Sequence, residues 1–205
     1  MAQTRSALEI HPVTPDRWSD MVELFERPGP RGGWSRTGAC YCMFWRLPPS
    51  EYEENFRRRS LDNVTGGPNK SLMGDIVAAN RIPGLLGYEE QTPVGWVSVT
   101  PRSELLRHNH VPAPGATEEP ADARPWAISC FYVHRSYQRS HVGEQLLGAA
   151  LEWALDHGAT SVEGYPVRIG SVDPYTGYDE MFEAAGFQLA KAGRGRGRAL
   201  WRLTV

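Results

Sequence analysis

Short hydrophobic stretches, some alternating with polar residues and some continuous, are separated along this chain by stretches with helical spacing. The short stretches predict strands at residues 8–13, 85–88, 93–99, 126–133, 160–165, 187–190 and 199–203. Apolar residues spaced near 3.6 predict helices at residues 15–25, 69–81 and 142–154. A charged run predicts an exposed helix at 50–59, and a short helix is predicted at 179–185, where Gly186 ends it. The chain therefore mixes strands and helices, with a β-loop-α-β unit at 126–165.

Segments rich in glycine, proline or polar residues separate the predicted strands and helices. The chain has 21 glycines and 16 prolines, too few for a low-complexity sequence, and many gather between the predicted elements. They bound a helical insert at about residues 28–83, which holds an aromatic and cysteine-rich segment at 39–46. This segment is predicted to be a buried loop or short strand, and the polar segment 102–124 an irregular surface loop. A length of 205 residues favours one domain over residues 1–205.

Charge and composition exclude several classes of partner. The 22 Lys and Arg against 24 Asp and Glu give a net charge of −2, so no basic field attracts nucleic acid. No apolar stretch approaches the roughly 18 residues of a membrane span, and the first residues do not form a signal peptide. We therefore expect a soluble cytoplasmic protein without nucleic-acid or membrane partners. Its three cysteines are expected to stay free thiols.

The loop after the apolar run 126–133 has the features of an anion site. A strand feeds a polar loop that opens a helix at Val142, where unpaired backbone N–H groups and the helix dipole favour negative charge. Gly143 lets a ligand approach the backbone closely. Side-chain donors come from Gln138, Arg139, Ser140 and His141. A plain crossover with a polar loop would have the same order of elements, so this pattern alone leaves both interpretations open.

The full string of this loop resembles a known signature. Tyr-Gln-Arg-Ser-His-Val-Gly, with Leu-Leu following, is similar to the acetyl-CoA signature of the GNAT superfamily of N-acetyltransferases, in which Arg or Gln precedes a Gly-x-Gly or Gly-x-Ala turn. The order of elements agrees with that family. The stretch Cys40-Tyr41-Cys42-Met43-Phe44-Trp45-Arg46 resembles an insert in some bacterial members. One departure is His141, which stands at the first glycine of the pattern.

The resemblance implies a fold, an activity and a cofactor site. It implies a mixed, mostly antiparallel sheet that is splayed at its centre and flanked by helices. It implies an enzyme that transfers the acetyl group of acetyl-CoA directly to a primary amine, with no metal. The residues that it implies for acetyl-CoA are Phe131, Tyr132 and Val133 on the strand, then Gln138, Arg139, Ser140, His141, Val142 and Gly143 on the loop. A non-catalytic CoA-binding or regulatory domain is the alternative.

Direct transfer needs a base for the ammonium and a proton donor for the leaving thiolate. Glu163 is the candidate base because it is the sole carboxylate in 161–167; a surface glutamate is the alternative interpretation. Many members of the family place an acid tyrosine in the short helix before Gly-Phe, where this chain has Phe182. Tyr175 and Tyr178 are the candidate substitutes, and either one could instead serve only in packing.

Other residues carry weaker hypotheses. Cys130 is expected to be a small buried hydrophobe rather than a nucleophile. Cys40-x-Cys42 and His108-x-His110 together would supply four zinc ligands, although at an unusual spacing.

Two further segments carry expectations about partners. The family places the insert over the acceptor site, so Trp45 and Arg46 are expected to shape acceptor binding. The Gly-Arg alternation at 193–198 predicts a solvated turn rather than an RNA contact. The resemblance implies a small-molecule or peptide amine as the acceptor, and the sequence leaves open whether the protein forms a homodimer.

Overall fold

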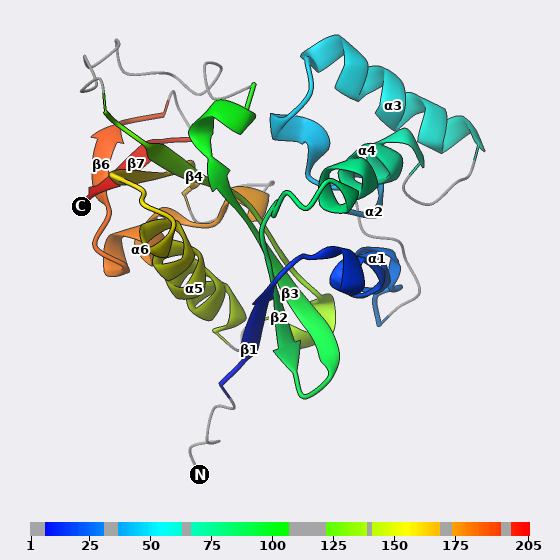
Figure 1. Cartoon of the computed structure of the whole chain (residues 1–205), viewed down its shortest axis with the longest axis horizontal. Coiled ribbons are helices and arrows are strands. Elements are labelled where there is room, and N and C mark those ends of the chain that lie inside the picture. Colours follow the sequence, from blue (N-terminus) through cyan, green and yellow to red (C-terminus); the bar gives the residue numbers. More distant parts are fainter. Residues whose placement is uncertain are drawn as a thin grey trace.

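Seven strands form one mixed sheet at the centre of the molecule (Figure 1). A computed structural model describes residues 7–30, 37–62, 67–106, 122–138, 141–168, 174–193 and 198–205. The strands are β1 (Glu9–Pro12), β2 (Leu85–Glu89), β3 (Thr92–Pro101), β4 (Pro125–Val133), β5 (Ser161–Gly164), β6 (Gln188–Lys191) and β7 (Leu200–Thr204). Their order is β1-β2-β3-β4-β5-β7-β6, antiparallel except for the parallel β4–β5 pair. The predicted mixed, mostly antiparallel sheet is confirmed.

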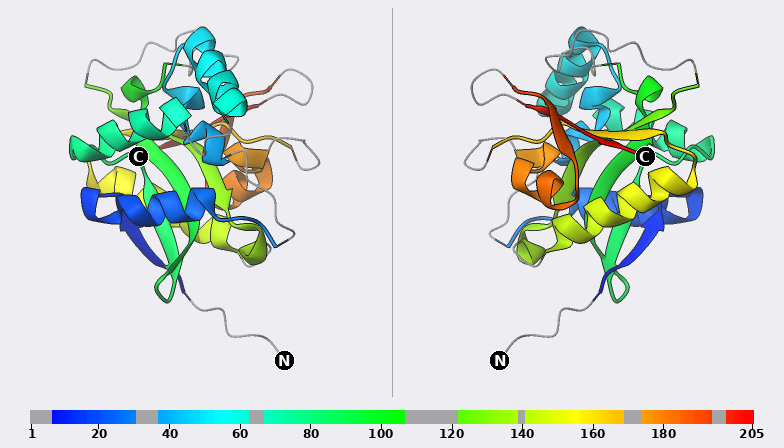
Figure 2. Two further views of the ribbon diagram at one scale, coloured as in Figure 1. Left: turned by 90° about the vertical axis from the view of Figure 1, so that its right-hand side faces the viewer. Right: turned by 90° about the vertical axis from the view of Figure 1, so that its left-hand side faces the viewer.

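Helices cover both faces of this sheet (Figure 2). They are α1 (Trp18–Glu26), α2 (Thr37–Cys40), α3 (Pro49–Asp62), α4 (Gly67–Ala78), α5 (Val142–Asp156) and α6 (Asp179–Ala184). Side chains of α1 and α4 pack with Trp96 and Tyr132 on one face, and side chains of α5 and α6 pack with Val97 and Phe131 on the other. Because β3 and β4 are covered on both faces, their residues are nearly all buried, as expected for a central strand pair.

The insert differs from its prediction in one segment. Residues 39–46 are largely buried, as predicted, but they belong to α2 and to the 3-10 helix η2 (Met43–Trp45) rather than to a loop or strand. Between the two helices, Tyr41 and Cys42 adopt left-handed backbone conformations, with φ of 44° and 53°. Two successive left-handed residues reverse the chain sharply, so the segment folds back into the core instead of extending.

The remaining segments follow the sequence pattern where the structure describes them. The 3-10 helix η3 (Arg102–Glu104) begins the predicted surface loop, of which residues 107–121 lie outside the described ranges. The Gly-Arg turn at 194–197 lies outside them as well. Among the described residues, no helix combines the length and the apolar run needed to cross a bilayer. One domain over residues 1–205 stays a prediction.

Candidate active site

Strand β4 changes its neighbours halfway along its length. Pro125–Ile128 pairs in parallel with Ser161–Gly164 of β5, whereas residues 129–133 pair only with β3 among the described strands. One edge of this second half therefore presents backbone N–H and C=O groups to something other than a strand. The sheet is splayed at its centre, as the resemblance implied.

A β-bulge turns two successive side chains of β4 to the same side. Ile128 and Cys130 face successive residues of β3, so Ser129 is an extra residue in β4. In a regular strand, neighbouring side chains alternate between the two faces. Here Ser129 and Cys130 both line one cavity, while Ile128 and Phe131 pack on the face that α5 covers.

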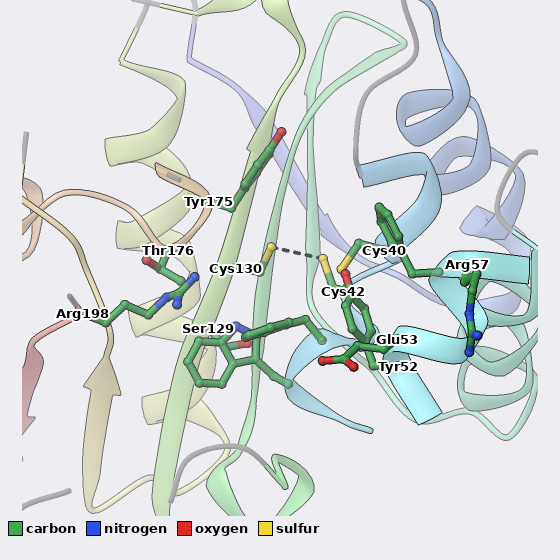
Figure 3. Close-up of a pocket in the computed structure, with 13 residues that line it drawn as sticks. Cys40, Cys42, Tyr52, Glu53, Arg57, Ser129, Cys130, Tyr175, Thr176 and Arg198 are labelled. Carbon is green, nitrogen blue, oxygen red and sulfur yellow. Dashed lines mark hydrogen bonds between the residues drawn. The ribbon is translucent and has the colours of Figure 1, made fainter. Parts of the chain in front are cut away.

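A cavity of about 400 Å³ opens at this bulge (Figure 3). Its volume suits a small organic ligand or the end of a larger one. On the side of β4, the lining residues are Ser129, Cys130, Tyr175, Thr176 and Arg198. On the side of the insert, they are Cys40, Cys42, Phe44, Trp45, Tyr52, Glu53, Phe56 and Arg57. We call this cavity the central pocket.

Aromatic rings hold a positive charge at one end of the central pocket. The Arg198 guanidinium carbon lies 5.6 Å from the ring centroids of both Phe44 and Trp45. Trp45 also stacks on Tyr165, which follows β5, at 5.0 Å between ring centroids. Trp45 therefore lines the pocket, as expected of an acceptor-shaping residue. Arg46 does not, because it points to Glu104 and forms an ion pair of 2.7 Å with it.

Glu53 places a carboxylate on the insert wall of the pocket. Its helix, α3, is positioned by a buried amide relay: Asn55 Nδ2 donates to Asn69 Oδ1 (3.1 Å), and Asn69 Nδ2 donates to the Ala39 carbonyl (2.9 Å). The relay ties α3, α4 and α2 together. Buried, satisfied amides of this kind fix the relative position of the elements that carry them.

Three thiols gather at the floor of the pocket. Cys42 Sγ and Cys130 Sγ lie 3.2 Å apart, and the Trp96 indole N–H donates to Cys42 Sγ at 3.2 Å. Burial and the neighbouring Cys42 raise the pKa of Cys40 to about 11, although Tyr52 donates a hydrogen bond to it. All three cysteines are free thiols, as the sequence predicted.

Thr176 contributes a buried hydroxyl group to the lining of the central pocket. It belongs to the 3-10 helix η6 (Pro174–Thr176), which packs against β4. Its side chain is 2% exposed, and Oγ1 has no hydrogen-bond partner among the described residues. A buried hydroxyl without a partner costs free energy unless a ligand or water satisfies it.

The described part of the loop between β4 and α5 ends in a left-handed residue, His141. His141 precedes α5 with φ of 57°, a left-handed conformation that glycine adopts without strain and that histidine tolerates. Its Nδ1 lies 3.0 Å from Glu144 Oε1. His141 therefore makes the turn that the glycine of the family pattern would make.

Room remains at the start of α5. Among the described residues, a Cβ added at Gly143 would meet Met181 Sδ at an ordinary 3.5 Å, so none of them crowds this position. Gln138 Nε2 donates to the carbonyl of Val133, which joins the loop to the end of β4. The structure thus brings together Phe131, Tyr132, Val133, Gln138, His141, Val142 and Gly143 around the end of β4 and the start of α5. Arg139 and Ser140 lie outside the described residues.

Glu163, the candidate base, lies in a buried ion cluster and does not line the central pocket. Its carboxylate accepts hydrogen bonds from Arg102 (2.9 Å), Arg202 (2.6 Å) and the Tyr165 hydroxyl (3.1 Å). Three donors already occupy its oxygens, so this geometry favours a structural role. A catalytic role for Glu163 stays a prediction. Tyr165 stays protonated far above neutral pH, because burial and the nearby Glu163 charge raise its pKa.

The candidate tyrosines separate in space. Tyr175 lines the central pocket, whereas Tyr178 is 36% exposed at the start of α6 and does not line it. Phe182 is fully buried and packs edge-on against Phe131, with its ring filling the space beside Gly164. This packing explains why an apolar ring occupies the position of the family's acid tyrosine.

The zinc hypothesis receives no support from the described residues, which contain no group of three or more potential metal ligands. His108 and His110 lie outside them. Sequence reasoning missed Glu53 and Thr176. Glu53 lies in a run of charged residues that predicts only an exposed helix. Thr176 has no signal in the sequence, because its need for a hydrogen-bond partner arises only when the folded chain buries its hydroxyl group.

The profile of the Acetyltransferase (GNAT) family matches residues 40–168. The chain belongs to this family. The matched residues include most of the insert, β4, the candidate acetyl-CoA loop and α5. They contain most of the pocket lining, whereas the lining residues Tyr175, Thr176 and Arg198 lie beyond them. No curated protein matches the chain in sequence.

Solved structures support the GNAT fold at low sequence identity. PaiA N-acetyltransferase from Thermoplasma acidophilum, in complex with coenzyme A, is 13% identical with a TM-score of 0.53, over 98% of this chain and all of that one. A GNAT acetyltransferase from Listeria monocytogenes is 11% identical with a TM-score of 0.52, over 97% and 95% of the two chains. A chain of the NatC complex bound to Gag peptide and CoA is 8% identical with a TM-score of 0.53, over 98% and 99%. These likenesses show the fold.

Proposed function

We propose that this GNAT protein transfers an acetyl group from acetyl-CoA to a primary amine of a small molecule or peptide by direct attack. The observation that carries the proposal is the central pocket, which opens where β4 leaves β5 and exposes a backbone edge. A reacting group held along that edge would meet an acceptor seated in the pocket. The PaiA and NatC structures hold CoA, which supports the same cofactor for this fold.

Acetyl-CoA fits the residues that the chain provides. The backbone of Phe131, Tyr132 and Val133 would hold its extended arm, because no second strand among the described residues pairs with this half of β4. The start of α5, with Gln138, His141, Val142 and Gly143, would hold its phosphates, together with the adjoining Arg139 and Ser140. The space beside Gly143 supports this assignment. When bound, acetyl-CoA supplies an activated thioester.

Residues of the central pocket would then transfer protons and stabilise the charge that develops during the reaction. The Glu53 carboxylate attracts an ammonium and can accept its proton, which frees the amine lone pair for attack. The Tyr175 hydroxyl can donate a proton to a leaving sulfur, and the Thr176 hydroxyl can donate a hydrogen bond to a developing negative charge. Glu163 and Tyr178, the other predicted catalytic residues, lie outside the pocket lining, and their roles are tested by substitution.

Ligand-induced stabilisation tests the proposal directly. Acetyl-CoA at 100 times its Kd stabilises a protein by about 2.7 kcal/mol, which for a chain of this length raises Tm by roughly 5–10 °C. Gly143→Asp places a negative charge at the start of α5 and should abolish this shift. Gly148→Asp is the matched control, because Gly148 lies on the same helix and an added Cβ there meets nothing within 4 Å. No shift at millimolar acetyl-CoA would refute the proposal.

One observation favours the alternative, a non-catalytic CoA-binding domain. Phe182 replaces the acid tyrosine of the family and is fully buried. That domain predicts an acetyl-CoA shift in Tm without thiol release over a broad panel of amines. Acetyl-dependent thiol release with any amine, lost in Tyr175→Phe, would favour the enzyme.

A further inference from the structure

Two cysteines from distant parts of the chain meet in the central pocket. Cys42 comes from the turn between α2 and η2, and Cys130 comes from the bulged part of β4. Their sulfur atoms lie 3.2 Å apart (Figure 3). A disulfide has an S–S bond of about 2.0 Å, so the sulfurs would need to approach by about 1.2 Å. Small rotations of the two side chains cover such a distance.

Hydrogen bonds direct these two sulfurs toward each other. The Trp96 indole N–H donates to Cys42 Sγ, the Cys42 thiol points at Cys130 Sγ, and the Cys130 thiol lies 3.9 Å from the Phe131 carbonyl. Cys42 is 2% exposed and Cys130 is 8% exposed, yet both line the pocket. A small oxidant that enters the pocket can therefore reach a thiol that bulky reagents cannot.

Cys40 lines the same pocket, but its chemistry differs. The sulfur–sulfur contact of 3.2 Å joins Cys42 to Cys130. The raised pKa of Cys40, about 11, keeps its thiol protonated at neutral pH, and the thiolate is the reactive form. Cys40 is therefore the matched control for the other two.

We propose that Cys42 and Cys130 are a redox-active pair that hydrogen peroxide converts into a reversible disulfide, and that this bond locks the central pocket. The Cys130 sulfur attacks one peroxide oxygen, so an S–O bond forms, the O–O bond breaks, and hydroxide leaves to take up the thiol proton as water. The Cys42 sulfur then attacks the Cys130 sulfur; the S–S bond forms, the S–O bond breaks, and a second water leaves with the Cys42 proton. Two thiols are oxidised and one peroxide is reduced to two waters.

The bond would join the two walls of the pocket. Cys42 belongs to the insert wall and Cys130 to the β4 wall, 88 residues apart in sequence. A cross-link that closes so long a loop restricts the unfolded chain strongly and fixes the spacing of the walls. We expect the oxidised protein to be more stable to heat and less accessible to ligands in the pocket. The proposal does not depend on acetyl transfer, because the disulfide is detected chemically.

The test starts from the full, reduced chain treated with hydrogen peroxide. We expect the number of free thiols, counted after unfolding, to fall from three to one, and peptide mapping to link Cys42 with Cys130. The Tm should rise, and dithiothreitol should restore both the thiols and the original Tm. An unchanged thiol count, a disulfide that contains Cys40, or sulfinic acid on Cys130 would overturn the proposal. The linked peptide without a rise in Tm would overturn the lock.

Variants separate the pair from its neighbour. Cys40→Ser should form the disulfide as the parent chain does, whereas Cys42→Ser and Cys130→Ser should form none and show no peroxide-dependent rise in Tm. Cys130→Ala provides a second variant in case serine is not tolerated at that buried position. Loss of the disulfide in Cys40→Ser would assign the chemistry to a different pair of thiols.

Discussion

Buried polar groups beside the two halves of β4 differ in whether they have hydrogen-bond partners. Where β4 pairs with β5, Glu163 is buried and its charge is balanced by Arg102 and Arg202, with the Tyr165 hydroxyl as a third donor. Where β4 leaves β5, the buried Thr176 hydroxyl has no partner among the described residues, and two thiols face a cavity. A satisfied cluster around Glu163 of β5 and an unsatisfied hydroxyl in η6 therefore lie beside the two halves of the same strand.

This difference assigns separate tasks to the two halves. A buried carboxylate with three donors stabilises the fold only while all its partners remain, and both of its oxygens already accept hydrogen bonds from the protein. A buried hydroxyl without a hydrogen-bond partner lowers the stability of the folded protein, and a bound ligand can supply the missing hydrogen bond. The paired half is built for stability and the splayed half for binding, and four substitution or pH experiments test that division.

The largest expected effect comes from Glu163→Gln. Removing the charge of the buried carboxylate leaves two half-buried arginines without their counterion, which costs about 3 kcal/mol of unfolding free energy. Urea unfolding should show this loss, while kcat per folded molecule stays within about twofold. A large fall in kcat with unchanged unfolding free energy would instead support the predicted role of Glu163 as the base.

Glu53→Gln should act on the other half. If this carboxylate accepts the ammonium proton, its loss lowers kcat about a hundredfold near neutral pH, with unfolding free energy nearly unchanged because the side chain is exposed. Glu51→Gln removes the same charge from the same helix without touching the pocket and should leave kcat unaltered. Equal effects of the two substitutions would mean that only the charge of α3 matters.

Thr176→Val should separate binding from stability. Valine replaces an unsatisfied hydroxyl by a methyl group of similar size, so unfolding free energy should stay equal or rise. The loss of one hydrogen bond to a ligand should lower kcat/KM about fivefold. Thr100→Val is the control, since Thr100 Oγ1 is also buried without a partner among the described residues but lies outside the pocket. A comparable loss in both variants would contradict a ligand contact at Thr176.

The smallest effect concerns alkaline pH. The pKa of Cys40 is raised from 9.0 to about 11 in the folded protein, so between these values the unfolded chain releases a proton that the folded chain keeps. Unfolding free energy should therefore be constant below pH 9 and fall as pH rises toward 11. Cys40→Ser should flatten this decline in urea titrations at pH 8.5 to 10. The buried tyrosines, whose pKa values are also raised, add to the decline near pH 10 but do so equally in both proteins. An identical slope in both proteins would contradict the raised pKa.

Much of the fold was predictable because its strands are short and their patterns strong. The hairpin at β2 and β3, the apolar run of β4 and the helix α5 all follow from periodicity. The segment around Tyr41 and Cys42 did not follow, because two left-handed residues without a glycine leave no local signal. The composition of this segment predicted that it is buried, but nothing in the sequence predicted its backbone conformation.

The site divided in the same way. The loop before α5 was singled out from its string of residues, and its role in binding acetyl-CoA stays a prediction; His141 adopts a left-handed conformation there. The catalytic assignments rested on position in the chain alone, and the structure puts Tyr175 in the pocket but Glu163 and Tyr178 outside its lining. Glu53 and Thr176 required tertiary contacts, since which side of α3 or η6 faces a cavity is decided by packing between elements distant in sequence.

The free edge of β4 also has a consequence for solubility. The segment from Ile128 to Val133 contains no charge, no proline and no glycine, and it is rich in residues that favour strands. An unpaired edge of such a segment is a template on which another chain can add a strand. The 3-10 helix η6 packs against β4. Both η6 and a ligand bound along this edge would therefore cover it and hinder aggregation, in addition to forming the site. Protein heated with bound acetyl-CoA should remain clear at temperatures where the free protein turns turbid.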